Sequence, residues 1–326
     1  MKVIILTEGT GATGYGHLTR CLSICQAFDE KKITPIFIAN CDKRGNDILL
    51  GVNLVTFNWL AELNKLHNII KAADILIIDS YLASNEVYLD LSQRVPKVIF
   101  IDDYQRINYP QGIILNGTIG AERLDYHNFA QDKMLLGVKY IPIRKEFWDV
   151  ADKIHNETVR HILITLGGND VRNISLTILD AVSKKYPNIN YTVVLGSDIN
   201  KNILPQHLVK KNIALQHSLS AASMLKLMLH SDIAISAAGQ TLYELARVGV
   251  PTVAIGVAQN QSFNLRGWIE SSFILDSLWY DDQEFNIKLG FLLEKTMNNN
   301  YRERIRKTIP LLVDGQGARR IVAQLN

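Results

Sequence analysis

The chain has few cysteines and no long uninterrupted apolar run. Cys21, Cys25 and Cys41 are its only cysteines, and an odd number clustered near the amino end is unlike a disulfide framework. No stretch reaches the ~18 to 20 uncharged apolar residues that span a bilayer, and the first apolar run is too short for a signal peptide. We therefore expect a soluble, cytoplasmic protein whose membrane contact is at most peripheral.

The chain also has little excess charge of either sign. Its 35 Lys and Arg residues nearly balance its 32 Asp and Glu residues, and the net charge of +3 does not by itself indicate nucleic-acid binding. Apolar residues make up 47% and charged residues 21%, as in ordinary globular proteins. A length of 326 residues predicts about two domains, and nothing indicates an oligomeric state.

Short apolar runs alternate with stretches of helical period, a pattern typical of a parallel sheet flanked by helices. We expect strands over residues 3–6, 35–39, 54–57, 75–78 and 98–101, and again over 162–166, 192–195, 233–236 and 252–255. This restart predicts an α/β protein with two successive doubly wound, Rossmann-like domains. Loops after the strands are where such sheets bind ligands.

The polar stretch over residues 148–160 is the expected boundary between the domains. It predicts an amino-terminal domain over 1–150 and a carboxyl-terminal domain over 151–326, with a cleft between them. Residues 301–326 are expected to be helical, with a break near 315–317.

A glycine-rich loop follows the first predicted strand. Gly9, Gly11 and Gly14 match G-x-G-x-x-G, which would indicate a nicotinamide or flavin cofactor if an acidic residue ended the second strand. Asp42 lies close to that strand end but beyond its tip. The alternative is that Gly14, Tyr15 and Gly16 close the loop before a helix over 18–28, so that glycines let a ligand approach the backbone.

In this second interpretation His17 projects from the helix start as a general base. The positive end of the helix dipole is expected to lower the pKa of His17 and favour the neutral imidazole. A histidine that merely caps or packs is the other possibility. Arg20 either approaches a phosphate or pairs on the surface, and Cys21 and Cys25 are expected to be buried rather than metal ligands.

The most informative stretch, residues 232–255, has the pattern of a complete β-α-β unit. The backbone N–H groups of Gly239, Gln240 and Thr241 would stand at a helix start and could bind a diphosphate. Glu244, one turn on, could accept hydrogen bonds from ribose hydroxyls, or it is simply an acid favoured early in a helix.

Two other strand ends carry candidate ligands. Asn260 and Gln261 could hold a sugar or phosphate, or serve as turn and cap residues. Gly167, Gly168 and Asn169 form a further strand-to-helix glycine turn. Each turn alone is a weak signal, but glycine turns in both halves indicate one ligand-binding site.

These residues together resemble a known group: the MurG-like GT-B enzymes, and within them the pseudaminic-acid-pathway UDP-sugar hydrolases and their spore-coat polysaccharide relatives (the PseG/SpsG group). The matching pieces stand in the family's order and span most of the chain. They are Gly14-Tyr-Gly16-His17-Leu-Thr-Arg20-Cys21, Ile78-Asp79-Ser-Tyr81, Ile101-Asp102-Asp103, Leu115-Asn116, Gly137-Val-Lys-Tyr140, Arg144-Lys-Glu-Phe147, Leu166-Gly167-Gly168-Asn-Asp170, Ala238-Gly239-Gln-Thr-Leu-Tyr-Glu244 and Asn260-Gln261.

The resemblance implies a GT-B fold, a UDP-sugar in the cleft, no metal, no cofactor and a last helix that packs back on the first domain. In the hydrolases, the histidine that matches His17 is thought to activate water for attack at the anomeric carbon. Tyr81 and Asn260 match positions that hold sugar or water near that carbon, and Glu244 matches the ribose ligand. Gly14, Gly16, Arg20 and Gln261 complete the expected substrate-binding set.

The chain departs from the family after its first strand. The hydrolases usually have an Arg-x-Asp type segment there, whereas this chain has Thr7-Glu8-Gly9-Thr10. The leading hypothesis is hydrolysis of a UDP-2,4-diacetamido-2,4,6-trideoxyhexose in nonulosonic-acid or surface-polysaccharide synthesis. The alternatives are a MurG-like glycosyltransferase and a non-catalytic protein that binds nucleotide sugars.

Overall fold

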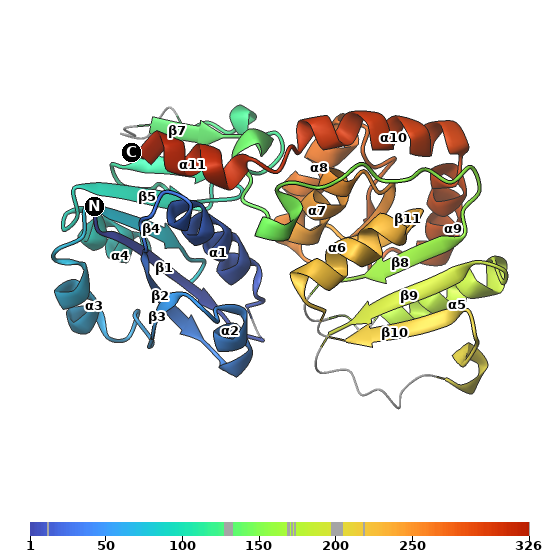
Figure 1. Cartoon of the computed structure of the whole chain (residues 1–326), viewed down its shortest axis with the longest axis horizontal. Coiled ribbons are helices and arrows are strands. Elements are labelled where there is room, and N and C mark those ends of the chain that lie inside the picture. Colours follow the sequence, from blue (N-terminus) through green and yellow to red (C-terminus); the bar gives the residue numbers. More distant parts are fainter. Residues whose placement is uncertain are drawn as a thin grey trace. The chain divides into compact units, whose positions relative to one another are not determined.

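The computed structural model describes residues 1–11, 13–126, 133–167, 170, 172, 174–196, 205–217 and 219–325. The chain forms two compact units (Figure 1). Unit 1 comprises Met1–Lys145 together with Gly315–Asn326, and unit 2 is Glu146–Asp314. Both units are parallel-sheet α/β structures, which confirms the predicted fold class.

Unit 1 is built on a seven-stranded sheet in the order β3-β2-β1-β4-β5-β6-β7. All its strand pairs are parallel. The strands are β1 Val3–Gly9, β2 Ile36–Cys41, β3 Asn53–Thr56, β4 Ile75–Asp79, β5 Lys97–Ile101, β6 Ile113–Asn116 and β7 Lys133–Leu136. The helices are α1 Gly16–Asp29, α2 Lys43–Ile48, α3 Leu63–Ile70, α4 Asn85–Ser92 and α11 Gly317–Leu325.

Both faces of this sheet are covered. Ile4 and Leu6 pack into one apolar cluster with Leu66 of α3 and Tyr88 of α4. Alternate strand residues such as Ile5 point to the other face, where α1 packs against β1. Burial on both faces explains why the central strands are continuous apolar runs rather than alternating ones.

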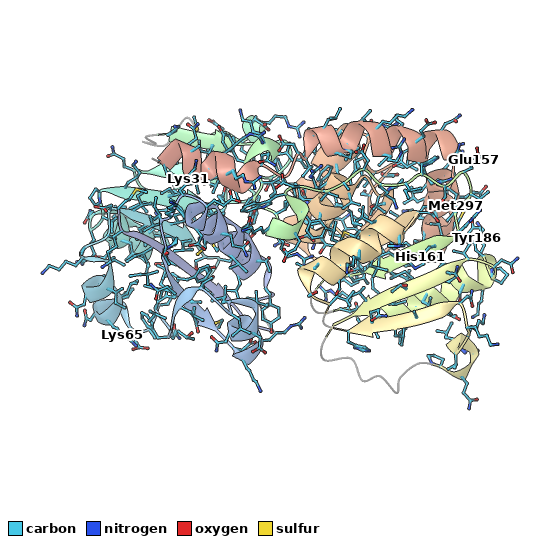
Figure 2. All side chains as sticks on the ribbon, in the orientation of Figure 1. Lys31, Lys65, Glu157, His161, Tyr186 and Met297 are labelled. Atoms are coloured by element: carbon cyan, nitrogen blue, oxygen red, sulfur yellow. The ribbon has the colours of Figure 1, made fainter. Side chains whose placement is uncertain are left out.

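Unit 2 has a six-stranded sheet in the order β10-β9-β8-β11-β12-β13, also parallel throughout. Its strands are β8 His161–Thr165, β9 Asn190–Leu195, β10 Ile213–His217, β11 Ile233–Ala237, β12 Thr252–Gly256 and β13 Leu278–Trp279. Its helices are α5 Ser175–Lys185, α6 Ala221–His230, α7 Gln240–Val248, α8 Ser262–Glu270, α9 Phe285–Thr296 and α10 Asn299–Leu312. In both units side chains fill the space between sheet and helices (Figure 2).

The last helix, α11, belongs to unit 1, although the chain reaches it only after passing through unit 2. It lies beside α1 (Figure 1). Arg319 donates two hydrogen bonds, at 2.8 and 2.9 Å, to the carboxylate of Glu30. At Gly317 the backbones are so close that a Cβ would lie 2.1 Å from the Ile141 carbonyl oxygen. The helix therefore begins where only glycine fits.

Candidate functional site

In each unit the strand order reverses at one point, and ligands of open parallel sheets bind beyond the carboxyl ends of the strands at such a point. In unit 1 the reversal lies between β1 and β4. The glycine loop and His17 follow β1, and Asp79, Ser80 and Tyr81 end or follow β4. These residues are distant in the sequence, and they meet because β1 and β4 pair in parallel and so end at the same edge of the sheet.

The glycine loop is held by its own backbone and by Asp42. The Gly14 N–H donates to the Thr10 carbonyl at 2.8 Å, and the φ of +81° at Gly14 is one that L side chains rarely adopt. Asp42 accepts from the Gly11 N–H at 2.9 Å and from the Tyr15 hydroxyl at 3.0 Å. The acid that a dinucleotide site would need for its ribose thus holds the loop, which favours the interpretation without a dinucleotide.

His17 lies in the first turn of α1 and faces a buried carboxylate. Its Nδ1 is 2.9 Å from Oδ1 of Asp79, whose side chain is fully buried. Arg20, one turn on in the same helix, donates twice to Asp79 at 2.6 Å and once to Asp103 at 2.6 Å. Arg20 is 7% exposed, so the expectation of a surface pair is wrong; its role as a substrate ligand stays a prediction.

The predicted lowering of the His17 pKa is also wrong. Burial and the nearby Arg20 lower the pKa of His17, but the Asp79 and Asp103 carboxylates together outweigh them, so the pKa lies above its ordinary value. Asp79 responds in the opposite direction. Burial raises its pKa, but Arg20 and His17 hold it well below the usual range. The pair therefore consists of an ionised carboxylate and an imidazole of increased basicity.

Tyr81 packs edge-on against the His17 ring, with ring centroids 4.4 Å apart. Its hydroxyl donates to Oδ2 of Asp103. Burial and this carboxylate raise the pKa of Tyr81, so the phenol stays neutral. The predicted residues His17, Arg20 and Tyr81 thus lie together in one charged cluster.

Sequence reasoning assigned no role to Glu8, Asp79 or Asp103, although two of them stand in the matched motifs. Glu8 lies near the end of β1 with 3% of its surface exposed. Its Oε1 accepts hydrogen bonds from the Ser80 hydroxyl at 2.8 Å and the Tyr81 N–H at 2.9 Å. An acidic residue at the carboxyl end of a buried apolar strand was the signal that could have identified Glu8 and Asp79.

In unit 2 the strand order reverses between β8 and β11, and the second glycine loop follows β11. Gly239 is the N-cap of α7, which begins at Gln240. Asn264 donates to the Ala238 carbonyl at 2.7 Å and accepts from the Tyr243 hydroxyl at 2.5 Å, so this buried side chain of α8 links the loop to α7. The N–H groups at this helix start can bind an anion.

The other predicted ligands of unit 2 differ in exposure. A Cβ added at Gly239 would lie 3.8 Å from Nε2 of Gln261, so these two residues are neighbours. Asn260 is exposed on the adjoining turn, whereas Glu244 is only 2% exposed. A ribose contact by Glu244 therefore requires the groups that cover it to move.

Of the third predicted turn, the structure describes only part. Gly167 has a φ of +92°, and a Cβ there would meet no described atom within 4 Å. Gly168 and Asn169 lie outside the described residues. Asp170 accepts from the Ser175 N–H at 2.8 Å, which holds the start of α5.

The two cysteines of α1 are buried, as predicted. Cys21 and Cys25 are free thiols, and burial raises the pKa of Cys25 to about 12. Within the described ranges, no group of three or more His, Cys, Asp or Glu side chains could hold a metal ion.

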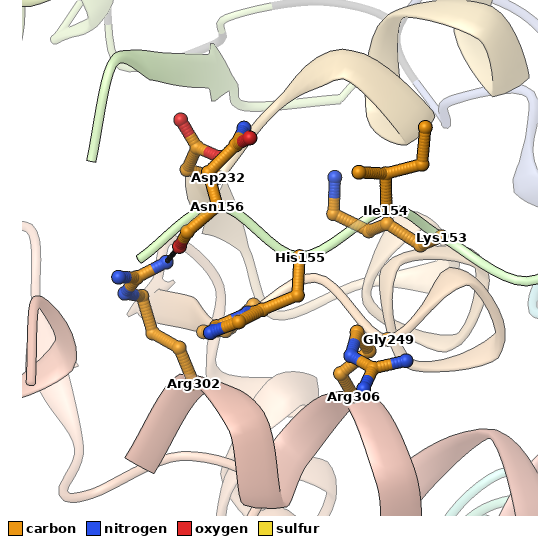
Figure 3. A pocket seen from close by; sticks show the side chains of 9 residues that line it. Lys153, Ile154, His155, Asn156, Asp232, Gly249, Arg302 and Arg306 are labelled. Carbon is orange, nitrogen blue, oxygen red and sulfur yellow. Dashed lines mark hydrogen bonds between the residues drawn. The ribbon is translucent and has the colours of Figure 1, made fainter. Parts of the chain in front are cut away.

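Lys153, Asn156, Asp232 and Arg302 are among the residues that line a small pocket (Figure 3). Asp232 directly precedes β11, so the pocket lies at the amino end of the second sheet. Arg302 donates to the Asn156 carbonyl at 2.8 Å, and the Asn156 amide donates to Asp232 at 2.8 Å. Lys153 donates to the Leu229 carbonyl at 2.6 Å, and burial lowers the pKa of Lys153 to about 8. These contacts anchor the segment that enters unit 2, so the pocket is structural.

Two parallel-sheet units with glycine loops at their switch points form the predicted GT-B fold, and solved structures agree. A spinosyn rhamnosyltransferase, SpnG, matches over all of both chains with a TM-score of 0.72 and 12% identity. MurG of Acinetobacter baumannii matches over all of both chains with a TM-score of 0.60 and 14% identity. At these identities the likeness shows the fold alone.

Among curated proteins, the chain is similar to members of the group that its motifs indicate. It is 28% identical, over 80% of its length, to a Helicobacter pylori protein named pseudaminic acid cytidylyltransferase and UDP-2,4-diacetamido-2,4,6-trideoxy-beta-L-altropyranose hydrolase, of which the match covers 45%. It is 23% identical over its whole length to 98% of the Bacillus subtilis spore coat polysaccharide biosynthesis protein SpsG. The resemblance to the PseG/SpsG type of GT-B protein is thus confirmed.

Some of these relatives are much longer than this chain. The chain spans about half the length of the first curated relatives that it matches, 55% and 45%. No family model matches it. In the part of the chain that the structure describes, no helix is long and apolar enough to cross a membrane.

Proposed function

We propose that the protein is an enzyme that hydrolyses a UDP-sugar to UDP and the free sugar without a metal. The observation that carries the proposal is the buried contact between His17 and Asp79 at the switch point of unit 1. The name of the Helicobacter pylori relative supports a 2,4-diacetamido-2,4,6-trideoxyhexose as the sugar. The Bacillus subtilis relative supports a place in surface-polysaccharide synthesis.

The chemistry follows from the geometry of the imidazole. With Nδ1 turned to Asp79, Nε2 of His17 is left to take a proton from a water molecule. The water oxygen then forms a bond to the anomeric carbon, and the bond from that carbon to the diphosphate oxygen breaks, its electron pair leaving with UDP. A general base of this kind contributes about 10² to 10⁴ in rate.

The diphosphate would be bound by unit 2. The start of α7 offers backbone N–H groups at Gln240 and Thr241, and the positive end of a helix dipole stabilises negative charge there. Gln261, beside Gly239, would add an amide donor. In this proposal Glu244 binds the ribose, and Tyr81 and Asn260 position the sugar or the water.

A glycosyltransferase is the second candidate, because several structural neighbours are glycosyltransferases and the segment after β1 departs from the hydrolase pattern. A sugar or lipid hydroxyl would then replace water as the acceptor, with the same base. A protein that only binds nucleotide sugars is the third candidate.

Product analysis separates the three candidates. The purified protein is incubated with the UDP-diacetamido-trideoxyhexose in buffer alone, and UDP and free sugar are quantified by chromatography. Hydrolysis predicts equal amounts of both products. UDP formed only after an acceptor is added indicates the transferase, and binding without products indicates the binding protein. In a parallel control, the protein should leave NADH fluorescence unchanged.

A further inference from the structure

Glu8 is a buried carboxylate on β1, the strand that leads into the loop before the proposed base. It lies near the end of β1, where the neighbouring Thr7 pairs in register with Asp79 of β4. It is 3% exposed, and neither the motifs nor the proposed reaction gives it a role.

One oxygen of Glu8 organises the turn after β4. Oε1 accepts from the Ser80 hydroxyl at 2.8 Å and from the N–H groups of Tyr81 and Leu82 at 2.9 and 3.3 Å. The Ser80 hydroxyl oxygen accepts in turn from the Ala83 N–H at 3.0 Å. Glu8 therefore fixes the turn that carries Tyr81, whose ring packs on His17.

The other oxygen of Glu8 has no such task. Oε2 is buried and has no hydrogen-bond partner among the described residues. A glutamine would present the same Oε1 acceptor to the turn without a charge to bury, and burying a charge destabilises a protein. The turn alone does not explain why this position is ionisable.

The groups around His17 indicate how the negative charge of Glu8 could affect the imidazole. The charged and titratable groups that act on the imidazole are Asp79 of β4, Arg20 of α1, Asp103 after β5 and Glu8 of β1, with Tyr81 packed on its ring. Two of these carboxylates, Asp79 and Asp103, pair with the Arg20 guanidinium, whereas Glu8 does not. Burial raises the pKa of Glu8, and the negative charge of Asp79 raises it further. The hydrogen bond from Ser80 and the charge of His17 lower it.

We propose that Glu8 is a positioning residue of the His17 centre: Oε1 fixes the turn that carries Tyr81, and the carboxylate charge stabilises the imidazolium that forms when His17 takes a proton. The catalytic meaning of this inference rests on the proposed function. The coupling between the two side chains, however, is a property of the free protein and can be measured without substrate.

The test is an NMR titration of the His17 ring in the wild-type protein and in Glu8→Gln. Removing a nearby negative charge should lower the His17 pKa by about half a pH unit or more. Glu86→Gln is the matched control, because Glu86 is an exposed acid on α4 of the same unit and should leave the titration unchanged. A folded Glu8→Gln protein with the wild-type His17 titration would overturn the proposal.

A reciprocal measurement keeps Glu8 in place, in case its replacement prevents folding. The Glu8 side-chain carbon is titrated by NMR in the wild type and in His17→Asn. Because coupling between two titrating groups is mutual, the Glu8 pKa should be higher once the cation at position 17 cannot form. Identical Glu8 titrations would refute the coupling. Failure of turnover with intact coupling would instead count against the proposed reaction.

Discussion

At the scale of single residues, the centre of unit 1 depends on a compact set of buried charges. Arg20 joins Asp79 and Asp103, and Asp79 in turn contacts His17. The buried Asp79 carboxylate is tolerated because Arg20 and His17 lie at hydrogen-bond distance from it. The same arrangement sets the protonation of the proposed base, so charge and reactivity are linked at this point.

The first prediction concerns pH. Only the neutral imidazole can accept a proton, so activity should fall as the pH drops through the His17 pKa, which lies above the ordinary value of 6.5. In Asp79→Asn the imidazolium loses its main stabilising charge. The acid limb of the kcat profile should therefore move to lower pH, and kcat at the plateau should fall because the base is weaker and less well oriented.

Asp90→Asn is the control for this profile. Asp90 also contacts a histidine of unit 1, with 2.6 Å between its Oδ2 and Nε2 of His67, but it lies partly exposed outside the site. Its replacement should leave the profile unchanged. An acid limb that stays in place in Asp79→Asn, in a protein with wild-type secondary structure, would contradict the role given to Asp79.

At the scale of elements, the proposed reaction uses two helix starts: the first turn of α1 would carry the base, and the start of α7 would bind the diphosphate. The second prediction is that Glu244→Ala weakens UDP binding about ten- to a hundredfold, since hydrogen bonds to a charged group are worth about 1.5 to 3 kcal/mol. Calorimetry measures this. Glu294→Ala, an exposed acid on α9 of the same unit, should bind UDP as the wild type does.

The third prediction concerns the end of α7. Gly249 has a φ of +73°, and a Cβ there would lie 3.1 Å from Cα of Arg306 and Cγ of Pro310. Gly249→Ala should therefore lower the free energy of unfolding by about 1 kcal/mol or more. Gly290 lies inside α9, where a Cβ has only the end of Lys185 nearby, at 3.6 Å. Gly290→Ala should raise the free energy of unfolding by about 0.5 to 1 kcal/mol.

Denaturant unfolding of both glycine variants distinguishes backbone strain from a general effect of glycine replacement. If the free energy of unfolding changed in the same direction in both variants, the explanation given for the end of α7 would be contradicted.

There is a physical reason why some strands were predicted from the sequence and others were missed. All nine expected strands exist, and all except the half-buried edge strand β3 are mainly apolar runs buried in a parallel sheet. The four missed strands, β6, β7, β10 and β13, include the edge strands β7, β10 and β13. Of these, β13 has two residues, and β10 alternates between exposed and half-buried positions. Edge strands carry less apolar sequence and so give a weaker signal.

The candidate site was predictable only in part. The glycine turns and His17 follow from local sequence, because turns and helix starts are local features. The contacts of Arg20 with Asp79, 59 residues away, and with Asp103, 83 residues away, arise only when the sheet forms. The sign of the His17 pKa change depends on these long-range contacts, which is why the helix dipole alone led to the wrong direction.

At the scale of the whole molecule, the chain completes unit 1 only with its last helix. Ile321, Val322 and Leu325 of α11 are buried. The fourth prediction is that a chain ending at Asp314 loses several kcal/mol of stability in unit 1, since each buried aliphatic side chain contributes about 1.5 to 3 kcal/mol. Amide NMR spectra should show the loss in unit 1 resonances while those of unit 2 persist.

Arg319→Ala in the full chain is the milder counterpart. The ion pair between Arg319 and Glu30 is partly exposed on both sides, so its loss should cost no more than about 1 kcal/mol. Comparable destabilisation by the point change and the truncation would contradict the view that apolar burial, rather than this pair, holds α11 in place.

The proposed reaction depends on one step, in which water activated by His17 attacks the anomeric carbon of a UDP-sugar. Turnover in ¹⁸O-labelled water, followed by mass spectrometry of the UDP, isolates that step. We expect UDP without label, release of free sugar in equal amount, and a rate lowered about 10² to 10⁴ in His17→Asn with UDP affinity retained. Labelled UDP, or unchanged turnover in His17→Asn, would show that water does not attack in this way.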